Sequence, residues 1–310
     1  MIILVTGASG FIGGKIAASL AMQDPKNHII ATGRSHTEKF QGYPNITYQS
    51  IDLSKKPPTI VCDICIHCAG LADDNSTKRQ FELNNEIATK HLIGALKQCQ
   101  LLIYISSASV YDFSDSKIKT EEDTGNPLKL SLYGNSKLKS EAIVSASRIP
   151  SIYILRPRAV YGNGDRVLLP RILKLIRKNK MVIPKSTSSN SSLTHIDNLL
   201  ETILVCIQKS KNGIHHYNVS DKRLYSIKDV FSKVLFQQYG TTEFIEIPNS
   251  ILRLILILKR VLGLNIPLSK QSLDYLTQNA VVNIRKLESE LNYHGKHHFM
   301  EFIESWNTNK

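Results

Sequence analysis

The sequence predicts an α/β fold: a Rossmann-like, doubly wound parallel sheet with a smaller, mostly C-terminal α/β substrate lobe. Two observations predict it. Short apolar runs alternate with helical patterns through the first half of the chain, and a glycine-rich turn joins the first run to the first helix. The 310 residues, of which 42% are hydrophobic, can form one large or two modest domains.

Apolar runs predict six strands in the first half of the chain, and helical patterns lie between them. The strands are expected at Ile2–Val5, His28–Thr32, Ile46–Ile51, Asp63–Cys68, Leu101–Ser106 and Ser151–Leu155. The helices are expected at Phe11–Met22, Lys78–Cys99 and Tyr133–Ser147. This alternation is typical of a parallel sheet that is covered by helices on both faces.

The alternation weakens after Arg156-Pro157. We expect a basic helix over Leu168–Lys180, followed by a flexible, serine-rich loop over Lys185–Ser192. Asp197 is expected to be the N-cap of a helix over Leu199–Gln208.

The stretch Ile251–Leu262 is strongly apolar and contains three basic residues. It is shorter than the roughly 20 apolar residues that a membrane-spanning helix needs. We therefore expect a helix packed within the second lobe, with a role at a membrane surface or in binding a lipid-like substrate as the alternative.

The chain is strongly basic, because 39 Lys and Arg residues stand against 26 Asp and Glu residues and give a net charge of +13. Such a charge favours anionic partners such as nucleotides, phosphorylated substrates or a membrane surface. The basic residues are dispersed and are not interleaved with aromatic residues, so no nucleic acid is expected. The N-terminal residues lack the basic start and cleavage site of a signal peptide, and a cytoplasmic location is expected.

Three of the five cysteines follow the spacing Cys62-x-x-Cys65-x-x-Cys68, which resembles a zinc-binding motif. The apolar run from Ile60 to Cys68 instead predicts a buried strand. Side chains three residues apart on a strand point to opposite faces, so Cys62 and Cys65 are not expected to bind one metal ion. We expect no metal site, and we expect the thiols to behave as small core residues.

The glycine-rich turn contains Gly7, Gly10 and Gly13 between the first strand and the first helix. Gly7 allows a tight turn, Gly10 allows the backbone to approach a pyrophosphate, and Gly13 allows close packing of helix on sheet. The free N–H groups at the helix N-terminus then favour phosphate binding. We expect a dinucleotide-binding domain formed by residues 1–163 and about 193–220, and a substrate lobe formed by residues about 164–192 and 221–310.

The residues after the second strand bear on the choice between NAD and NADP. An acidic residue there would bind the ribose 2′-hydroxyl, whereas an arginine would accept a 2′-phosphate. The sequence has Arg34 at this place and no carboxylate before Glu38. NADP is therefore favoured over NAD as the cofactor, with Arg34 as the residue that binds the phosphate.

Tyr133 and Lys137 are four residues apart, which places both side chains on one face of the predicted helix. A tyrosine hydroxyl is a weak base at neutral pH, and a neighbouring ammonium group would lower its pKa. Ser107 follows a predicted strand and could hold a substrate oxygen. These three residues therefore predict proton exchange at a substrate oxygen, coupled to hydride transfer at a nicotinamide.

Further motifs follow in order along nearly the whole chain. They are Thr6-Gly7-Ala8-Ser9-Gly10-Phe11-Ile12-Gly13, Asp52-Leu53, His67-Cys68-Ala69-Gly70, Asn84-Asn85, Ser106-Ser107-Ala108-Ser109-Val110-Tyr111, Tyr133-x-x-x-Lys137, Leu155-Arg156-Pro157-Arg158-Ala159-Val160-Tyr161-Gly162, Thr194-His195-Ile196-Asp197-Asn198 and Tyr217-Asn218-Val219-Ser220. With these motifs the chain resembles an extended short-chain dehydrogenase/reductase of the NAD(P)-dependent epimerase/dehydratase superfamily.

The resemblance implies that Ser107, Tyr133 and Lys137 form the catalytic triad. It also implies that Tyr133 and Lys137 contact the cofactor, with Lys137 holding the nicotinamide ribose. Beside the glycine turn and Arg34, it assigns cofactor contacts to Phe11, Ile12, Asp52, Leu53, Ala69, Gly70, Asn85, Pro157 and Val160.

Two departures from the family patterns argue against a dehydratase and an epimerase reaction. Sugar-nucleotide dehydratases of this superfamily carry an Asp-Glu pair where this chain has Ala108-Ser109, and many epimerases carry an Asn where it has Ala159. The stretch from Arg156 to Arg171 instead resembles the 3β-hydroxysteroid-dehydrogenase-like branch, which includes reductases of 2-alkyl-3-oxoalkanoates.

We therefore expect an NAD(P)-dependent oxidoreductase that acts on a fairly apolar carbonyl compound or secondary alcohol. An NAD-dependent sugar-nucleotide epimerase is the first alternative, and a non-catalytic NAD(P)-binding regulator is the second. The expected partner is the small-molecule substrate or a sugar nucleotide, with a homodimer and a weak membrane-surface contact as further candidates.

Overall fold

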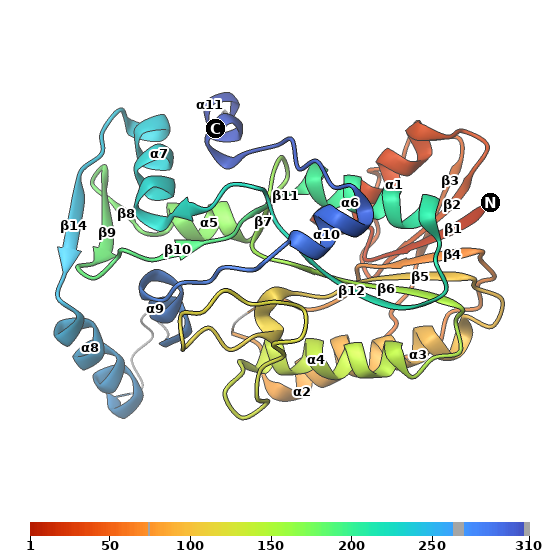
Figure 1. Cartoon of the computed structure of the whole chain (residues 1–310), viewed down its shortest axis with the longest axis horizontal. Coiled ribbons are helices and arrows are strands. Elements are labelled where there is room, and N and C mark those ends of the chain that lie inside the picture. Colours follow the sequence, from red (N-terminus) through yellow and green to blue (C-terminus); the bar gives the residue numbers. More distant parts are fainter. Residues whose placement is uncertain (74, 263–269, 307–310) are drawn as a thin grey trace.

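A seven-stranded parallel sheet forms the centre of the protein (Figure 1), whose structure, a computed structural model, describes residues 1–73, 75–262 and 270–306. The strands lie in the order β12-β6-β5-β4-β1-β2-β3. Their bounds are β1 Ile2–Thr6, β2 His28–Gly33, β3 Ile46–Ser50, β4 Ile64–His67, β5 Leu101–Ile105, β6 Ser151–Pro157 and β12 Gly213–Val219. The doubly wound Rossmann-like sheet and its six predicted strands are thus confirmed, and β12 is a seventh strand.

Helices cover both faces of this sheet (Figure 1). On one face lie α1 (Phe11–Gln23), α6 (Ile196–Lys209) and α10 (Arg285–Leu291), whose residues Ile16, Leu199 and Leu287 join one core cluster. On the other face lie α3 (Ala88–Ala95) and α4 (Leu132–Ser145), whose residues Leu92 and Val144 join a second core cluster. The buried apolar strands are therefore enclosed on both sides, as a parallel sheet requires.

The helix that was predicted over Lys78–Cys99 is not uniform. The structure divides it into α2 (Lys78–Phe81), the π-helical turn η1 (Glu82–Ile87) and α3, which ends at Ala95. Thr77 caps α2 through a hydrogen bond from the Gln80 backbone N–H. The π-helical turn adds one residue to the helical turn, a feature that often marks functional sites.

The basic helix that was predicted over Leu168–Lys180 is wrong. Only α5 (Leu168–Leu173) is helical, and β8 (Ile176–Arg177) and β9 (Lys180–Pro184) form an antiparallel hairpin. Lys178 and Asn179 both adopt positive φ angles, 48° and 60°, which a two-residue hairpin turn requires and a helix excludes. A third strand, β14 (Phe244–Ile247), pairs with β9 in parallel.

The serine-rich loop that was predicted to be flexible is half-buried. Within it, β10 (Asn190–Ser191) pairs with β13 (Tyr225–Ser226), and Ser189, Ser191 and Ser192 are each at most 3% exposed. The Ser189 hydroxyl donates to the Leu276 carbonyl, and the Ser192 hydroxyl accepts from the Val282 N–H. These hydroxyl groups satisfy backbone groups of the C-terminal segment, which explains their burial.

Asp197 was predicted to be the N-cap of its helix, but His195 is the N-cap of α6. The His195 ring accepts a hydrogen bond from the Asp197 backbone N–H, and Asp197 lies in the first helical turn. His195 itself belongs to β11 (Thr194–His195), which pairs in parallel with β7 (Val160–Tyr161). A carboxylate in the first turn still interacts favourably with the helix dipole.

A separate hydrophobic cluster lies beyond the sheet, around β9, α7 (Ile227–Tyr239) and α11 (Phe299–Ser305). Met181, Phe231 and Phe299 are buried in it. Next to these elements are α8 (Asn249–Leu262) and α9 (Lys270–Thr277), shown in blue in Figure 1.

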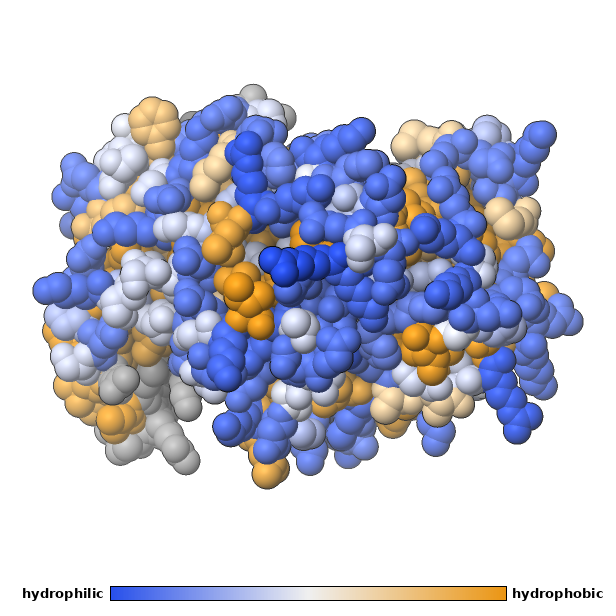
Figure 2. All heavy atoms as spheres, viewed as in Figure 1, coloured by the Kyte–Doolittle hydropathy of each residue, from blue (hydrophilic) through white to orange (hydrophobic). Residues whose placement is uncertain are grey.

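The helix that was predicted over Ile251–Leu262 is present as α8, but its apolar face is not packed in the described structure. Among its described side chains only Leu252 is buried. Ile251, Leu254, Ile257 and Leu258 are 40–59% exposed. Figure 2 shows apolar side chains gathered at the end of the molecule that α8 occupies. No helix in the described ranges has the length and hydrophobicity needed to cross a membrane.

The cysteine side chains contribute to the core, but the geometry differs from the prediction. Cys62 and Cys65 are both buried in the same cluster, together with Cys99. The alternation of faces does not apply to this pair, because β4 begins only at Ile64 and Cys62 precedes it. Cys68 is partly exposed at the opposite end of β4.

Candidate active site

The candidate residues gather at the carboxyl edge of the sheet, where β1, β4, β5 and β6 all end. In open α/β sheets, ligands bind outside this edge. The edge also carries the loops that follow each strand, so residues far apart in sequence meet there.

The glycine turn after β1 is closely packed against the segment after β4. Gly7 has φ +70°, and a Cβ at this position would lie 2.7 Å from the Ala69 backbone nitrogen. A Cβ on Gly13 would lie 2.6 Å from the Gly7 carbonyl oxygen. The turn therefore requires glycine at both positions, as the sequence predicted.

The N-terminus of α1 is open to an anionic group. Its N-cap is Gly10, no side chain caps its N–H groups, and its first turn contains no acidic residue. Phe11 and Ile12, at the start of the helix, are partly buried against the core. Free N–H groups and the positive end of the helix dipole fit the pyrophosphate of a dinucleotide.

Lys39 is a basic residue of this region that the sequence analysis missed. Its ammonium group donates to the carbonyl oxygens of Ser9 and Gly10, at 3.0 and 3.2 Å. Burial and the nearby Arg166 lower its pKa. No motif marks Lys39, because it comes from the loop after β2 and reaches the glycine turn only in the folded chain.

Arg34 directly follows β2 and is exposed. Its guanidinium donates to Asn84 Oδ1 at 2.7 Å, so it bridges from β2 to the π-helical turn. Arg34 also contributes to the lowered pKa of Asp52, although the hydrogen bond from Ser54 is the largest cause. Leu53 beside it is buried. Arg34, Asp52 and Leu53 thus lie in one region.

Asn85 in the π-helical turn is buried and tied to two neighbouring segments. Its side chain accepts from the Leu71 N–H at 2.6 Å and donates to Ser136 Oγ at 2.8 Å. A Cβ on Gly70 would lie 3.4 Å from Asn85 Oδ1 and 4.0 Å from Lys137 Nζ. Gly70, Asn85 and Lys137 are therefore brought together.

Helix α4 carries Tyr133 and Lys137 one turn apart, and Ser131 caps it. Tyr133 is partly exposed and contacts the Phe81 ring. Lys137 is buried, and its ammonium group donates to the Ile105 carbonyl at 2.7 Å. Burial lowers the pKa of Lys137 to about 7, while the Glu141 carboxylate acts in the opposite direction.

Ser107 lies at the end of β5 and caps the short helix η2 (Ala108–Val110). It is partly exposed, and its hydroxyl group is 3.1 Å from Ser109 Oγ. Its neighbour Ser106 is buried and donates to Glu141. Of the paired serines, only Ser107 thus presents a partly exposed hydroxyl group at this edge.

Gly134 fixes the distance between α4 and the Ser107–Ser109 segment. A Cβ at this position would overlap the Ser109 carbonyl oxygen. Only glycine allows this approach, which places the start of α4 against the Ser109 backbone. The spacing of the Tyr-x-x-x-Lys pattern does not reveal this requirement.

A buried ion pair between Arg156 of β6 and Glu141 of α4 holds α4 on the sheet. Arg156 donates to both carboxylate oxygens of Glu141, at 2.9 and 2.7 Å, and to the Tyr111 hydroxyl at 2.9 Å. The Tyr111 hydroxyl in turn donates to Asn218 Oδ1 in β12. Glu141 was not singled out from the sequence, although its position four residues after Lys137 is a usable signal.

Pro157 ends β6, and Val160 lies in β7, partly buried against the sheet core. Between them, Ala159 adopts a positive φ of 48°, and its carbonyl accepts from the Thr194 N–H. A left-handed conformation is favoured by glycine or asparagine rather than alanine. The backbone here thus has the shape that an asparagine would favour.

One group of metal-ligating types occurs in the described residues: His195, Asp197 and His297, whose ligand atoms lie within 4.8 Å of one another. Asp197 already pairs with the Lys15 ammonium at 3.0 Å, and the His195 ring caps α6. Burial also lowers the pKa of His195 to about 4. His195 thus acts as a helix cap and Asp197 as a partner in an ion pair, which accounts for their position without a metal ion.

Comparison with known proteins identifies the family to which this chain belongs. The model of the NAD dependent epimerase/dehydratase family matches residues 3–220. A ketoreductase of Stigmatella aurantiaca that acts on a farnesylated quinoline oxide is 22% identical over 67% of this chain, and the match spans 65% of that protein, less than two thirds. UDP-glucose 4-epimerase of Vibrio cholerae is 27% identical over 71% of this chain and 70% of its own length.

Solved structures match nearly the whole chain. UDP-glucuronic acid 4-epimerase from Bacillus cereus in complex with NAD superposes with a TM-score of 0.74, 22% identity and coverage of 98% of this chain and 96% of that one. A dTDP-glucose 4,6-dehydratase from Bacillus anthracis in complex with NAD gives a TM-score of 0.75 at 16% identity, with 100% and 97% coverage. At these identities the likeness shows the fold.

Proposed function

Because the chain belongs to the NAD-dependent epimerase/dehydratase family, we propose that it is an NAD(P)-dependent oxidoreductase acting on a carbonyl compound or secondary alcohol. The observation that carries this proposal is the meeting of Ser107, Tyr133 and Lys137 at the carboxyl edge of the sheet, beside Gly70 and Asn85. A proton-transfer group next to the expected nicotinamide position is what hydride exchange at a carbonyl carbon requires.

Each of the three residues has a role in this proposal. When bound, the cofactor supplies or accepts the hydride. Ser107 holds the substrate oxygen through its hydroxyl group, and Tyr133 exchanges a proton with that oxygen. The Lys137 ammonium stabilises the phenolate form of Tyr133 and binds the nicotinamide ribose, while Glu141 and Arg156 keep α4 in place.

The cofactor site comprises the edge residues described above. Gly7, Gly10, Phe11, Ile12 and Gly13 bind the pyrophosphate, and Arg34, Asp52 and Leu53 border the adenosine. Ala69, Gly70, Asn85, Pro157 and Val160 line the channel toward the nicotinamide. We propose NADP as the preferred form, because Arg34 and Lys39 place positive charge at the end of the site where β2 offers no carboxylate.

The proposed substrate is fairly apolar and binds between the sheet edge and the lobe of residues about 164–192 and 221–310, apart from α10, which packs on the sheet. The exposed apolar residues of α8 favour such a substrate over a sugar nucleotide. The ketoreductase among the relatives acts on a farnesylated compound, which is consistent with this choice.

An NAD-dependent sugar-nucleotide epimerase is the second candidate. The Vibrio cholerae and Bacillus cereus relatives carry this activity in their names. Ala159 argues against it, because it lacks the amide that would bind a substrate diphosphate. A non-catalytic NAD(P)-binding regulator is less favoured, because the chain retains all three residues of the triad.

A panel assay separates these three functions. The purified protein is incubated with reduced cofactor and a series of 3-oxo acyl compounds and cyclic ketones, and separately with UDP-hexoses and NAD. Oxidation of the reduced cofactor with a ketone supports the oxidoreductase. Inversion at C4 of a UDP-hexose without ketone reduction would favour the epimerase, and tight cofactor binding with neither reaction would favour the regulator.

A further inference from the structure

Two buried cysteines lie at the amino edge of the sheet, on the opposite side from the candidate active site. Cys62 comes two residues before β4, and Cys99 comes two residues before β5. These strands pair in parallel with Ile64 opposite Leu101. Extending this register backward by two residues brings Cys62 opposite Cys99.

The distance between such neighbours suits a disulfide. Adjacent strands lie about 4.8 Å apart, which falls within the Cα separation that disulfides span. The pairing extends to the residues next to the cysteines, because the Gln100 N–H donates to the Asp63 carbonyl at 2.9 Å. Both thiols belong to the same core cluster, so they point to the same face of the sheet.

The two thiols interact directly and differ in acidity. A hydrogen bond between them raises the pKa of Cys62, and the same bond lowers the pKa of Cys99. The Cys99 sulfur also lies 3.2 Å from the Leu101 carbonyl oxygen. The two sulfur atoms are thus in contact, as disulfide formation between them requires.

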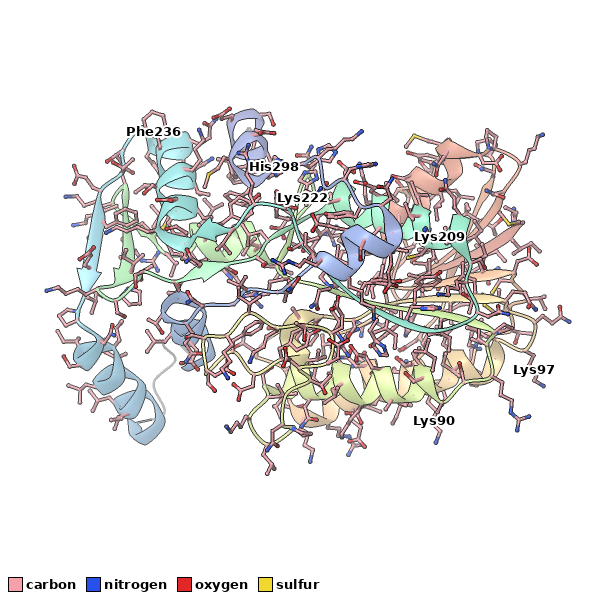
Figure 3. All side chains as sticks on the ribbon, in the orientation of Figure 1. Lys90, Lys97, Lys209, Lys222, Phe236 and His298 are labelled. Carbon is pink, nitrogen blue, oxygen red and sulfur yellow. The ribbon has the colours of Figure 1, made fainter. Side chains whose placement is uncertain are left out.

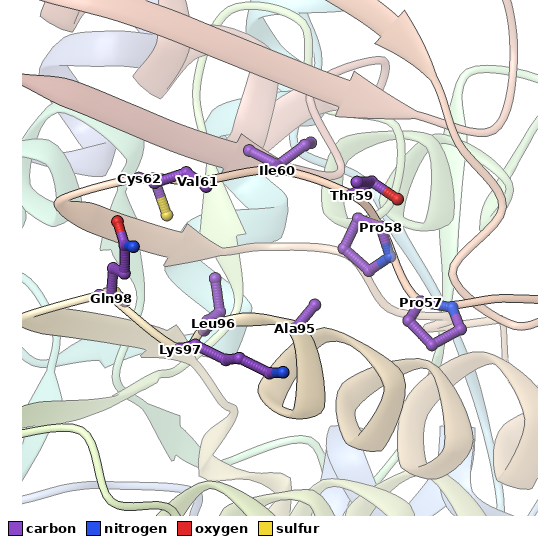
Figure 4. Close-up of a pocket in the computed structure, with 11 residues that line it drawn as sticks. Pro57, Pro58, Thr59, Ile60, Val61, Cys62, Ala95, Leu96, Lys97 and Gln98 are labelled. Carbon is purple, nitrogen blue, oxygen red and sulfur yellow. The ribbon is translucent and has the colours of Figure 1, made fainter.

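A cavity of about 400 Å³ connects this pair to the surface. Cys62 and Cys99 both line it. Figure 4 shows Cys62 together with Pro57, Pro58 and residues that follow α3, such as Leu96 and Gln98. The cavity offers a small molecule a route to two thiols that are otherwise only 3% exposed. Cys65, the third thiol of the cluster, does not line it.

We propose that Cys62 and Cys99 form a reversible disulfide by exchange with a small-molecule disulfide that enters this cavity. One of the two thiols attacks one sulfur of the small disulfide, whose other half leaves as a thiol with the proton of the attacking group. The second cysteine then attacks the sulfur of the first and releases the second half as a thiol. Two protein thiols are oxidised and one small disulfide is reduced to two thiols, so atoms and electrons balance.

The oxidised protein should be more stable than the reduced one. The disulfide closes the chain between residues 62 and 99, a segment that includes β4, α2, η1 and α3. Closing a loop of this length reduces the entropy of the unfolded chain, and we expect the melting temperature to rise by about 5 °C or more.

Oxidised glutathione is the probe that tests this proposal. The native, full-length protein is equilibrated with oxidised and reduced glutathione at several ratios, quenched with acid, alkylated and digested. Mass spectrometry should find a peptide pair linked through Cys62 and Cys99, which dithiothreitol releases. Cys62→Ala and Cys99→Ala should abolish both the link and the rise in melting temperature, whereas Cys206→Ala, a buried cysteine in another cluster, should retain both.

Other results would overturn the proposal. Absence of the linked pair in the native protein, or a link that forms only in urea, would mean that the cavity does not admit the oxidant to the pair. A predominant link from either residue to Cys65 would show that the register argument is wrong. The mapping on the unsubstituted protein decides the question even if an alanine variant does not fold.

Discussion

Lys137 couples the stability of the protein to pH. Burial lowers the pKa of its ammonium group to about 7 in the folded protein. In the unfolded chain the same group titrates near pH 10.4. Between these values the unfolded state binds more protons, so the free energy of unfolding rises with pH, and below pH 7 the buried charge reduces the stability of the fold.

Replacing Lys137 by methionine removes this penalty. We expect Lys137→Met to melt above the unsubstituted protein at pH 6, and we expect the difference to shrink toward pH 9. Lys139→Met is the matched control, because Lys139 is exposed on the same helix. Melting curves across this pH range test the effect, and a difference independent of pH would contradict it.

Arg34 is predicted to bind the 2′-phosphate of NADP. Its guanidinium is exposed beside Asn84, so a phosphate can reach it without rearrangement of the core. Arg34→Ala should weaken NADP binding roughly tenfold to a hundredfold and leave NAD binding almost unchanged. Titration calorimetry with both cofactors measures this, with Arg148→Ala, another exposed arginine, as control. Equal losses for both would mean that Arg34 supports the adenine pocket instead.

The packing of Gly7 and Gly13 was predictable from turn geometry. Tyr133 and Lys137 were singled out by helical spacing together with the family resemblance, and their catalytic roles stay predictions. Lys39 could not be found this way, because its contacts with the glycine turn arise only from the path of the loop after β2.

The contact between α4 and the Ser107–Ser109 segment is the element-scale feature on which the site depends. Gly134→Ala should force these elements apart, because its Cβ would overlap the Ser109 carbonyl. We expect a loss of about 1–3 kcal/mol in stability and a marked fall in turnover.

Gly94→Ala provides the matched control for this variant. Gly94 also lies in a helix, but a Cβ there would meet nothing within 4 Å. The change should stabilise α3 by roughly 0.5–1 kcal/mol, because alanine favours the helix. Urea unfolding of both variants tests the contrast, and similar effects at the two positions would refute the packing argument.

Strands and helices were predicted correctly where the hydrophobic pattern of the sequence was continuous. The prediction failed where a single turn determines the structure. The apolar runs of the central strands and the helical pattern of α1 gave correct elements. The stretch 168–180 has helical composition, yet the positive φ angles of Lys178 and Asn179 make it a hairpin. β12 was missed because His215, His216 and Asn218 interrupt its apolar pattern.

At the scale of the whole molecule, the positive charge is spread over the surface. The labelled lysines lie on two sides of the sheet, with Lys90 and Lys97 near α3 and Lys209 and Lys222 near α6 and α10 (Figure 3). This matches the dispersed pattern of basic residues in the sequence. The substrate could not be predicted from the sequence, because it depends on how the second lobe shapes its pocket.

An apolar substrate has a measurable consequence for this lobe. Burial of each additional methylene group contributes about 0.8 kcal/mol, so kcat/KM should rise roughly threefold to fourfold per methylene along a 3-oxo acyl series until the pocket is full. Steady-state kinetics along that series tests this, with Leu254→Ser expected to flatten the rise and Leu128→Ser, an exposed leucine outside the lobe, expected to leave it unchanged. A flat profile together with C4 epimerisation of a UDP-hexose would favour the epimerase.

The central claim is that Tyr133 exchanges a proton with the substrate oxygen, and Tyr133→Phe tests it most directly. The variant keeps the ring and its contact with Phe81 and removes only the hydroxyl group. Turnover of the best ketone should fall roughly 10²- to 10⁴-fold while cofactor affinity changes little, and Tyr239→Phe, at an exposed tyrosine, should have no effect. Near-normal turnover in Tyr133→Phe would contradict the proposed mechanism.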